Sequence, residues 1–252
     1  MLDLVDAIDL HSHYNHGSPY DQIIEHPMAR CEIDYLMEEY NSSHIRCGVY
    51  SSFASVLEPK SIVDENNHLY EISQKHERVY QWVVIDPRRD ETLDQADRIL
   101  TSEKCLGIKI HPGYHGYDIV EYGDKIFSYA NEKEAFVLMH PDKIELMPGF
   151  ADRYPKMKLI IAHLGWVAHV DAIEQAKHKN IFSDTSGIAS SNNNVIEYTI
   201  NRVGSEHIFF GTDTYSCAFQ RGRIQFARIP EKDKENILLN NALRMFPGKF
   251  NF

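Results

Sequence analysis

The feature that most constrains the fold is a series of eight short apolar runs, separated by amphipathic stretches along the whole chain. Runs such as 136–139 and 159–162 are continuously apolar and do not alternate with polar residues. This pattern is typical of parallel strands that are covered on both faces. We therefore predict eight strands, at 6–11, 45–53, 78–85, 106–111, 135–140, 158–163, 181–185 and 207–212.

The stretches between these runs carry apolar residues at helical spacing. They predict helices at 64–77, 92–100, 121–131, 144–153, 167–177 and 193–202, and a terminal helix at 232–245. Eight strands that alternate with helices favour an α/β fold of the (β/α)8 TIM-barrel type over a doubly wound sheet. Because no linker, repeat or low-complexity tract interrupts the pattern, we expect a single domain over residues 1–252.

A long connection at 14–43 follows the first predicted strand. It combines Gly17, Pro19 and Pro27 with a helical stretch at 32–40. In a barrel, such a loop-helix insertion lies over the carboxyl ends of the strands, where ligands bind. The segment is either a lid or a packed loop without functional motion, and the sequence supports both interpretations equally.

The composition limits the expected compartment and partners. A hydrophobic content of 43% is enough for a large core, and the net charge of -11 disfavours a surface that binds nucleic acid through its phosphates. The four cysteines form no Cys-x-x-Cys pair, and the amino terminus does not resemble a signal peptide. No apolar run reaches the ~18 residues that cross a bilayer. We expect a cytoplasmic protein without nucleic-acid or membrane partners, and a homodimer as the commonest oligomer.

Side chains that bind metals or substrates gather where the predicted strands end. His11 and His13 stand two residues apart, and in an extended strand such side chains project from one face. Since the carboxyl ends of parallel strands meet at one mouth of a barrel, we expect all such residues to lie close together. The others are Lys109, His111, His140, His163 and Asp213.

Strand parity is consistent with this grouping. In three strands the candidate shares a face with residues two and four positions earlier, so that it can face inward without a register break. These candidates are His140 after Phe136 and Leu138, His163 after Leu159 and Ile161, and Asp213 after Phe209 and Gly211.

The motifs, taken in their order, resemble the amidohydrolase superfamily and, more closely, its amidohydrolase-2 (amidohydrolase-related) branch. The matching segments are Asp9-Leu10-His11-Ser12-His13, 107–112 (GIKIHP), 138–141 (LMHP), 161–165 (IAHLG), 210–213 (FGTD) and 240–246 (NNALRMF). That branch contains metal-dependent TIM-barrel hydrolases and decarboxylases. The resemblance implies one divalent metal held by His11, His13, His140 and Asp213, with His163 beside it as a base or an electrophile.

The implied ligands suit hydrolytic chemistry. Neutral imidazoles together with a carboxylate favour Zn²⁺, with Mn²⁺ or Fe²⁺ as alternatives. Such a metal lowers the pKa of its bound water to ~7. Asp213 can then accept the proton of the water, while His163 polarises the scissile carbonyl or stabilises the developing oxyanion.

Further residues near the strand ends are candidates for supporting roles. Lys109 binds a substrate carboxylate or, if it is carboxylated as in other members of the superfamily, bridges a second metal. His111 and Arg221 are candidates for substrate binding, the arginine through bidentate contacts. Asp184 and Ser186, at the end of the seventh strand, are candidates for orienting a ligand.

We predict a metal-dependent hydrolase of an ester, lactone or amide bond in a small molecule. A non-oxidative decarboxylase of the aminocarboxymuconate-semialdehyde type, which would use the same ligands, is the alternative. A TatD-like deoxyribonuclease is disfavoured because that family's fourth-strand glutamate motif is absent and the chain is acidic. A non-enzymatic barrel would lack at least one metal ligand, and none is missing. The loops that set specificity carry no readable code for the substrate.

Overall fold

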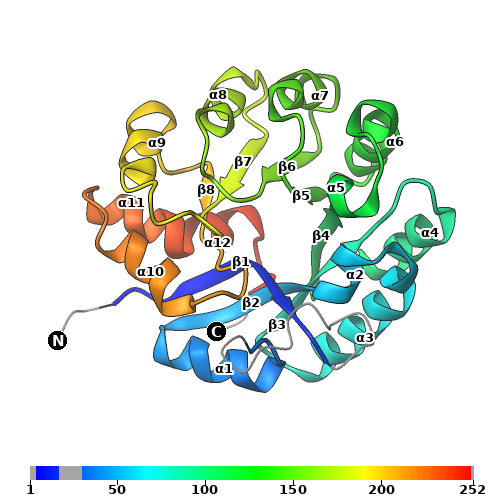
Figure 1. The fold of residues 1–252 in the computed structure, drawn as a ribbon, viewed down its shortest axis with the longest axis horizontal. Coiled ribbons are helices and arrows are strands. Elements are labelled where there is room, and N and C mark those ends of the chain that lie inside the picture. Colours follow the sequence, from blue (N-terminus) through cyan, green and yellow to red (C-terminus); the bar gives the residue numbers. More distant parts are fainter. Residues whose placement is uncertain (1–3, 17–29, 251–252) are drawn as a thin grey trace.

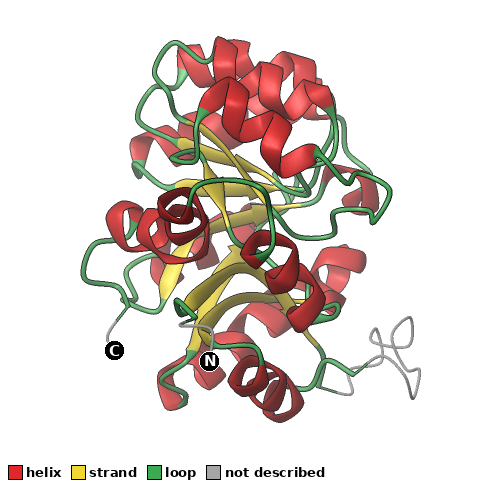
Figure 2. Cartoon of the chain, turned by 90° about the vertical axis from the view of Figure 1, so that its left-hand side faces the viewer, coloured by secondary structure: helices red, strands yellow, loops and turns green. Residues whose placement is uncertain are grey.

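The computed structural model describes residues 4–16 and 30–250, and it confirms the α/β TIM barrel. Eight parallel strands lie side by side in sequence order inside a ring of helices (Figures 1 and 2). Backbone hydrogen bonds from Leu10 N to Phe210 O (2.9 Å) and from Asp213 N to His11 O (2.8 Å) join the first strand to the chain after the eighth. The strands are β1 Ala7–Tyr14, β2 Ile45–Ser52, β3 Val79–Val84, β4 Cys105–Ile110, β5 Phe136–Met139, β6 Lys158–Ile161, β7 Ile181–Asp184 and β8 Ile208–Phe209.

The predicted helices are present close to their predicted bounds. They are α1 Ile33–Ser42, α3 Ile62–Lys75, α4 Asp90–Ile99, α6 Ile119–Glu132, η3 Ile144–Leu146 with α7 Met147–Arg153, α8 Val167–Gln175 and α9 Val195–Val203. The terminal stretch consists of α11 Glu231–Glu235, a π-helical turn η4 Asn236–Asn240 and α12 Asn241–Met245. Among the described residues, no helix combines the length and apolar character that a membrane span requires.

Four helical segments were not predicted. They are α2 Phe53–Leu57, η2 Pro59–Ser61, α5 Pro112–His115 and α10 Cys217–Gln225. Segments such as α2 and α5, with 5 and 4 residues, are too short to show a helical periodicity. The helical part of the predicted insertion is α1, whereas Gly17, Pro19 and Pro27 lie outside the described residues, so the lid hypothesis stays a prediction.

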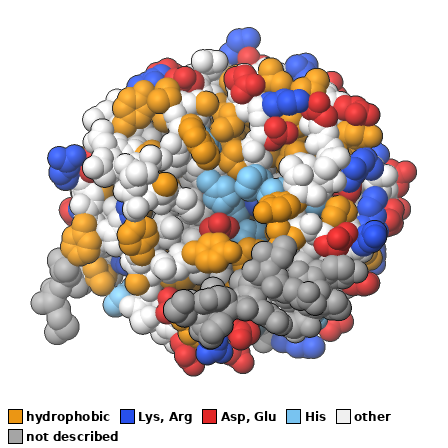
Figure 3. Space-filling view, viewed as in Figure 1, with side chains coloured by type: hydrophobic (Ala, Val, Ile, Leu, Met, Phe, Trp, Pro, Cys, Tyr) orange, Lys and Arg blue, Asp and Glu red, His pale blue; other side chains and the backbone are white. Residues whose placement is uncertain are grey.

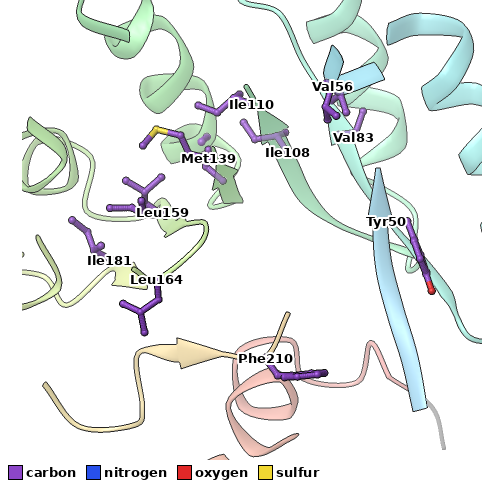
Figure 4. Packing of buried hydrophobic residues seen from close by; sticks show 14 of the residues in the cluster. Tyr50, Val56, Val83, Ile108, Ile110, Met139, Leu159, Leu164, Ile181 and Phe210 are labelled. Atoms are coloured by element: carbon purple, nitrogen blue, oxygen red, sulfur yellow. The ribbon is translucent and has the colours of Figure 1, made fainter. Parts of the chain in front are cut away.

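Two buried apolar layers hold the barrel together. The inner layer joins strand residues such as Leu10, Trp82 and Phe136 to Phe246, whose ring lies 4.3 Å from that of Phe136 and closes the amino end. The outer layer joins the opposite strand faces to the helices, and Figure 4 shows part of it, including Met139. The filled interior makes the barrel a packed core and not a pore, and in this fold active sites lie at the carboxyl mouth.

An extra residue in β1 turns its two histidines into the barrel. Ile8 and Leu10 pack in the inner layer, so regular alternation would direct His11 and His13 outward. The pairing of β1 with β2 shifts by one residue within 9–12, which is a β-bulge. The bulge reverses the alternation, and both imidazoles are buried at the mouth.

A second bulge does the same for Lys109 in β4. Leu106 packs in the inner layer, and Lys109 lines the mouth three residues later, a spacing that regular alternation does not allow. The pairing of β4 with β3 shifts by one residue between Cys105 and Gly107. Glycine is required here because a Cβ atom at Gly107 would lie 2.4 Å from the carbonyl oxygen of Phe136.

Candidate metal centre

Three of the predicted ligands converge at the mouth of the barrel. Ligand atoms of His11, His13 and Asp213 all lie within 4.8 Å of one another. Asp213 Oδ1 is 3.2 Å from His13 Nε2 and 3.8 Å from His11 Nε2. The two histidines were predicted at the end of the first strand, but they lie within β1. Asp213 follows β8 and has a φ of 56°. A left-handed residue other than glycine is a strained feature of the kind that clusters at functional sites.

An oxygen atom holds the outer nitrogen of each histidine in this group. His11 Nδ1 donates to Asp184 Oδ2 at 3.0 Å, and His13 Nδ1 donates to the carbonyl of Ser51 at 3.2 Å. Because these oxygens only accept, the Nε2 lone pairs are left to face the centre of the group. Burial, together with the charge of Lys109, lowers the pKa of His11 to about 3. Neutral imidazoles and a carboxylate are donors that fit a divalent cation such as Zn²⁺ or Mn²⁺.

Asp184 and Ser186 contact the histidines that they were predicted to orient. Ser186 Oγ lies 3.0 Å from His11 Nδ1 and 3.0 Å from His163 Nδ1, and it donates to the second carboxylate oxygen of Asp184. Burial acts to raise the pKa of Asp184, but His11, His163 and the Ser186 hydroxyl lower it more. The pKa therefore lies well below its ordinary value, and one ionised carboxylate orients both histidines.

His163 reaches the mouth through a turn. Strand parity allowed His163 to face inward together with Leu159 and Ile161, but these two residues belong to the outer apolar layer, so the face that they share points outward. The strand β6 ends at Ile161, and a φ of 63° at His163 turns its side chain into the cavity. Gly187 leaves room for the ring, because a Cβ atom there would lie 3.0 Å from His163 Nδ1.

Lys109 is fully buried beside the group. Its Nζ lies 2.9 Å from His11 Nε2. Burial lowers the pKa of Lys109 to about 8, although the charges of Asp213 and Asp184 act to raise it. The side chain is therefore a cation at neutral pH. Among the described residues that line the cavity, it is the only lysine or arginine.

His140 and His111 form the wall on the other side of the cavity. Their rings stack with centroids 3.9 Å apart, and the centroid of His140 is 5.1 Å from that of His163. Burial, followed by the charge of Lys109, lowers the pKa of His140 to about 3. The group of ligand atoms within 4.8 Å does not include His140 among the described residues. The structure thus brings together three of the four predicted ligands and places the fourth as a neighbour.

A cavity of about 220 Å³ opens between these walls. Figure 3 shows histidines, coloured pale blue, at the centre of the mouth. The apolar part of the cavity lining comes from Phe53, Val56 and Leu57 of α2, together with Tyr114 and Tyr215. The α2 residues were not predicted to line the site, although their place directly after the second strand is the signal that could have indicated them. The cavity suits a small molecule with an apolar part.

Arg221 does not belong to this cavity. Its guanidinium donates to the carbonyl of His44 at 3.2 Å and to the carbonyl of Val5. These residues precede β2 and β1, at the amino end of the barrel, opposite the mouth. The helix α10, which follows β8, carries Arg221 away from the mouth, so the structure supports a role in holding two strands instead of the predicted substrate contact.

A family model described as amidohydrolase matches residues 8–248. No curated protein matches the chain in sequence. Similar solved structures include a 2,6-dihydroxybenzoate decarboxylase from Rhizobium, with 15% identity and a TM-score of 0.76 over 96% of this chain and 99% of that chain. A dihydroxybenzoic acid decarboxylase from Polaromonas sp. JS666, with bound manganese and 2-nitroresorcinol, has 14% identity and a TM-score of 0.76, covering 96% and 97%. A Pseudomonas putida protein assigned as a 2-pyrone-4,6-dicarboxylic acid hydrolase has 13% identity and a TM-score of 0.68, covering 96% and 98%. At these identities the likeness concerns the fold alone.

Proposed function

The chain belongs to the amidohydrolase family, and from this premise we propose that it is a metal-dependent hydrolase of an ester, lactone or amide bond. Its substrate is a small molecule that carries a carboxylate. His11, His13 and Asp213 would hold one divalent cation, with His140 as the fourth candidate. Zn²⁺ suits these donors best, and Mn²⁺ is the alternative that the manganese in the Polaromonas decarboxylase favours. When bound, the cation supplies a Lewis acid that acidifies water and polarises a carbonyl oxygen.

The observation that carries this proposal is the position of Asp213. Its carboxylate faces the cavity beside His13 Nε2, with a fifth of the side chain exposed (20%). Burial acts to raise the pKa of Asp213, but its contact with His13 and the nearby histidines lower it more, so it is well below its ordinary value. An ionised carboxylate at this point can accept a proton from the attacking water and return it to the leaving group.

His163 would assist as an acceptor. Its Nδ1 lies 3.3 Å from the carbonyl oxygen of Ser186, which can only accept, so the ring proton sits on Nδ1. The lone pair of Nε2 then faces the cavity. This arrangement favours the base over the electrophile, the two roles that the resemblance left open for His163.

The charge of Lys109 favours an anionic substrate. Its buried ammonium is the one lysine or arginine among the described residues of the lining. A carboxylate that enters a cavity of low polarity gains most from a cation that is itself desolvated. We therefore assign Lys109 to the substrate carboxylate, and a carboxylated Lys109 that bridges a second metal is the alternative.

Decarboxylation is the second candidate, which the two similar decarboxylases favour. The same cation and Lys109 would hold the carboxylate, and carbon dioxide would leave in place of an alcohol, acid or amine.

The two reactions differ in their products. Protein loaded with Zn²⁺ or with Mn²⁺ should be incubated with 2-pyrone-4,6-dicarboxylate, simple lactones and 2,6-dihydroxybenzoate, with Asp213→Asn as the matched control. We expect the pyrone or a lactone to release acid without carbon dioxide, and we expect Asp213→Asn to lose this acid release. Carbon dioxide release that depends on Asp213 would instead establish the decarboxylase, and turnover that persists in Asp213→Asn would contradict both candidates.

A further inference from the structure

The imidazole of His111 lines the cavity, and its own contacts fix which of its nitrogen atoms carries the proton. We propose that His111 is a specificity-determining hydrogen-bond donor, whose neutral imidazole is held with its proton on Nε2 so that this wall binds an acceptor oxygen of the substrate. The inference deepens the proposed function and rests on it for the identity of the site. The character of His111 itself follows from its own contacts.

The proton of His111 is placed by the backbone. The amide N–H of Tyr114 donates to His111 Nδ1 at 3.2 Å, where His111 caps the start of α5. An amide can only donate in this contact, so Nδ1 must hold a lone pair. A neutral imidazole carries one proton, which is then on Nε2.

The surroundings keep His111 neutral. The side chain is buried, and it stacks on the neutral ring of His140. The ring of Tyr114 also packs against it, with centroids 4.7 Å apart. A protonated His111 would lose the hydrogen bond from the Tyr114 amide, so this contact itself requires a lone pair on Nδ1.

The donor of His111 is available to a ligand. His111 lines the cavity. Within residues 4–16 and 30–250, no hydrogen-bond partner is found for its Nε2, and this atom is not among the fully buried ones. A partly accessible N–H that lines a cavity gains a partner when a substrate oxygen binds there.

The loop that carries His111 is clamped from two sides. Arg88 makes two hydrogen bonds to the buried Asp86, at 2.9 and 2.7 Å, and it also donates to the carbonyls of His115 (2.5 Å) and Gly116 (3.2 Å). On the other side, His115 Nε2 donates to the carbonyl of Ser55 in α2 at 3.0 Å. The clamp ties α5 both to the end of β3 and to the apolar wall of the cavity, so Arg88 is a positioning residue for His111.

The two walls therefore recognise different atoms. His163 presents a lone pair and His111 presents an N–H, and the ring of His140 lies next to both. A carboxylate or carbonyl oxygen satisfies His111, whereas an ammonium group or any other donor is repelled. The chemical class that fits is a compound with an oxygen acceptor within reach of His111.

The tautomer can be measured directly. Two-bond ¹H–¹⁵N spectra of the histidine side chains should be recorded on Zn²⁺-loaded protein between pH 6 and 8, with His111→Gln to identify the signal. We expect His111 to show a protonated Nε2 and an unprotonated Nδ1 across this range. A proton on Nδ1, or an imidazolium at pH 6, would overturn the proposal. This result does not depend on turnover, so it separates failure of this inference from failure of the proposed hydrolase.

The recognition can be measured with benzoate as the probe. Calorimetric titration of Zn²⁺-loaded protein should give benzoate binding that is about 10–100-fold weaker in His111→Phe, which keeps an aromatic ring without the donor. His111→Gln, whose amide can supply an N–H near the place of Nε2, should recover most of the affinity. Metal content and thermal unfolding of each variant show whether it has folded. Equal losses in both variants, unchanged binding in His111→Phe, or no binding of benzoate to the wild type would each contradict the assignment.

Discussion

The two sides of the cavity hold their histidines in opposite ways. On the metal side, the Nδ1 atoms of His11 and His13 meet the oxygens of Asp184 and Ser51, so both rings donate outward. On the far side, the Nδ1 atom of His111 meets a backbone N–H and accepts. The comparison shows that one residue type supplies two chemistries in one cavity, and that the group behind each ring decides which one.

Replacing Asp213 removes the proposed base and should have the largest effect. For Asp213→Asn we expect a loss of about 10²–10⁴-fold in kcat, the range for a general acid–base residue. Steady-state kinetics with metal content on the same samples tests this, because the loss should exceed what any change in occupancy explains. Activity within tenfold of wild type at full occupancy would remove Asp213 from the mechanism.

Replacing Asp184 tests the oxygen behind His11. Asp184→Asn can present an amide N–H to His11 Nδ1. Nδ1 would then accept a hydrogen bond, as it does in His111, and the ring proton would move to Nε2. We expect metal affinity to fall about 10–100-fold, as for other groups that orient a ligand. Competition with a chelator measures it, and Asp94→Asn, on the exposed face of α4, is the matched control. Equal metal affinities in the two variants would show that the Asp184 carboxylate does not determine how His11 binds the metal.

Loosening the clamp tests the far side alone. In Arg88→Met the loop of α5 loses its bonds to Arg88, and misplacing a binding group in this way can cost up to about 10²-fold in kcat/KM. We expect the loss mostly in KM, with metal affinity unchanged, since no metal ligand touches Arg88. A parallel loss of metal would mean that the two sides are not independent.

A methyl group at Gly187 tests the ring of His163. The residue has a φ of 61°, and a Cβ atom would meet His163 Nδ1 at 3.0 Å. We expect Gly187→Ala to lower the free energy of unfolding by about 1–2 kcal/mol, the cost of a left-handed residue with a side chain. Urea denaturation measures the change. No loss of stability would contradict the left-handed conformation of Gly187.

The clamp should also leave a small signature in the pH dependence of stability. Burial acts to raise the pKa of Asp86, but the hydrogen bonds and the charge of Arg88 lower it more, so the net shift is downward. A carboxyl group whose pKa is depressed on folding adds stability above its unfolded pKa, ordinarily about 3.9, and loses it as the pH falls further. The wild type should therefore lose its advantage over Asp86→Asn below about pH 4. Urea unfolding at pH 7 and pH 3 tests this, and a constant difference would contradict it.

The sequence was sufficient for the eight strands, for the longer helices between them and for most of the group at the mouth. Segments such as 136–139 and 159–162 are continuous apolar runs, so burial alone identifies their strands. The bulges of β1 and β4 could not be derived in this way, because the register depends on the neighbouring strand. The turn at His163 was missed for the same reason, since strand parity does not apply beyond the end of β6.

Contacts between distant segments were also beyond the sequence. Arg221 follows the last strand and was predicted to bind substrate, but it contacts carbonyls at the opposite end of the barrel. The clamp joins Arg88 to His115 and Gly116, which lie 27 and 28 residues further along the chain. Only the closed barrel brings such segments together, since their spacing in the sequence follows no local period.

The bulge in β1 has a consequence for reading related chains. Inward apolar residues occupy even positions, Ile8 and Leu10, and the histidines occupy odd ones, His11 and His13. A strand with a strict period of two cannot direct both sets to one side, so a related chain with the same inner residues and histidines needs the same extra residue. A deletion of Asp9 would restore a strict period of two, which keeps both imidazoles inward only by turning Leu10 out of the inner apolar layer. The length of this strand is therefore under as much constraint as its histidines.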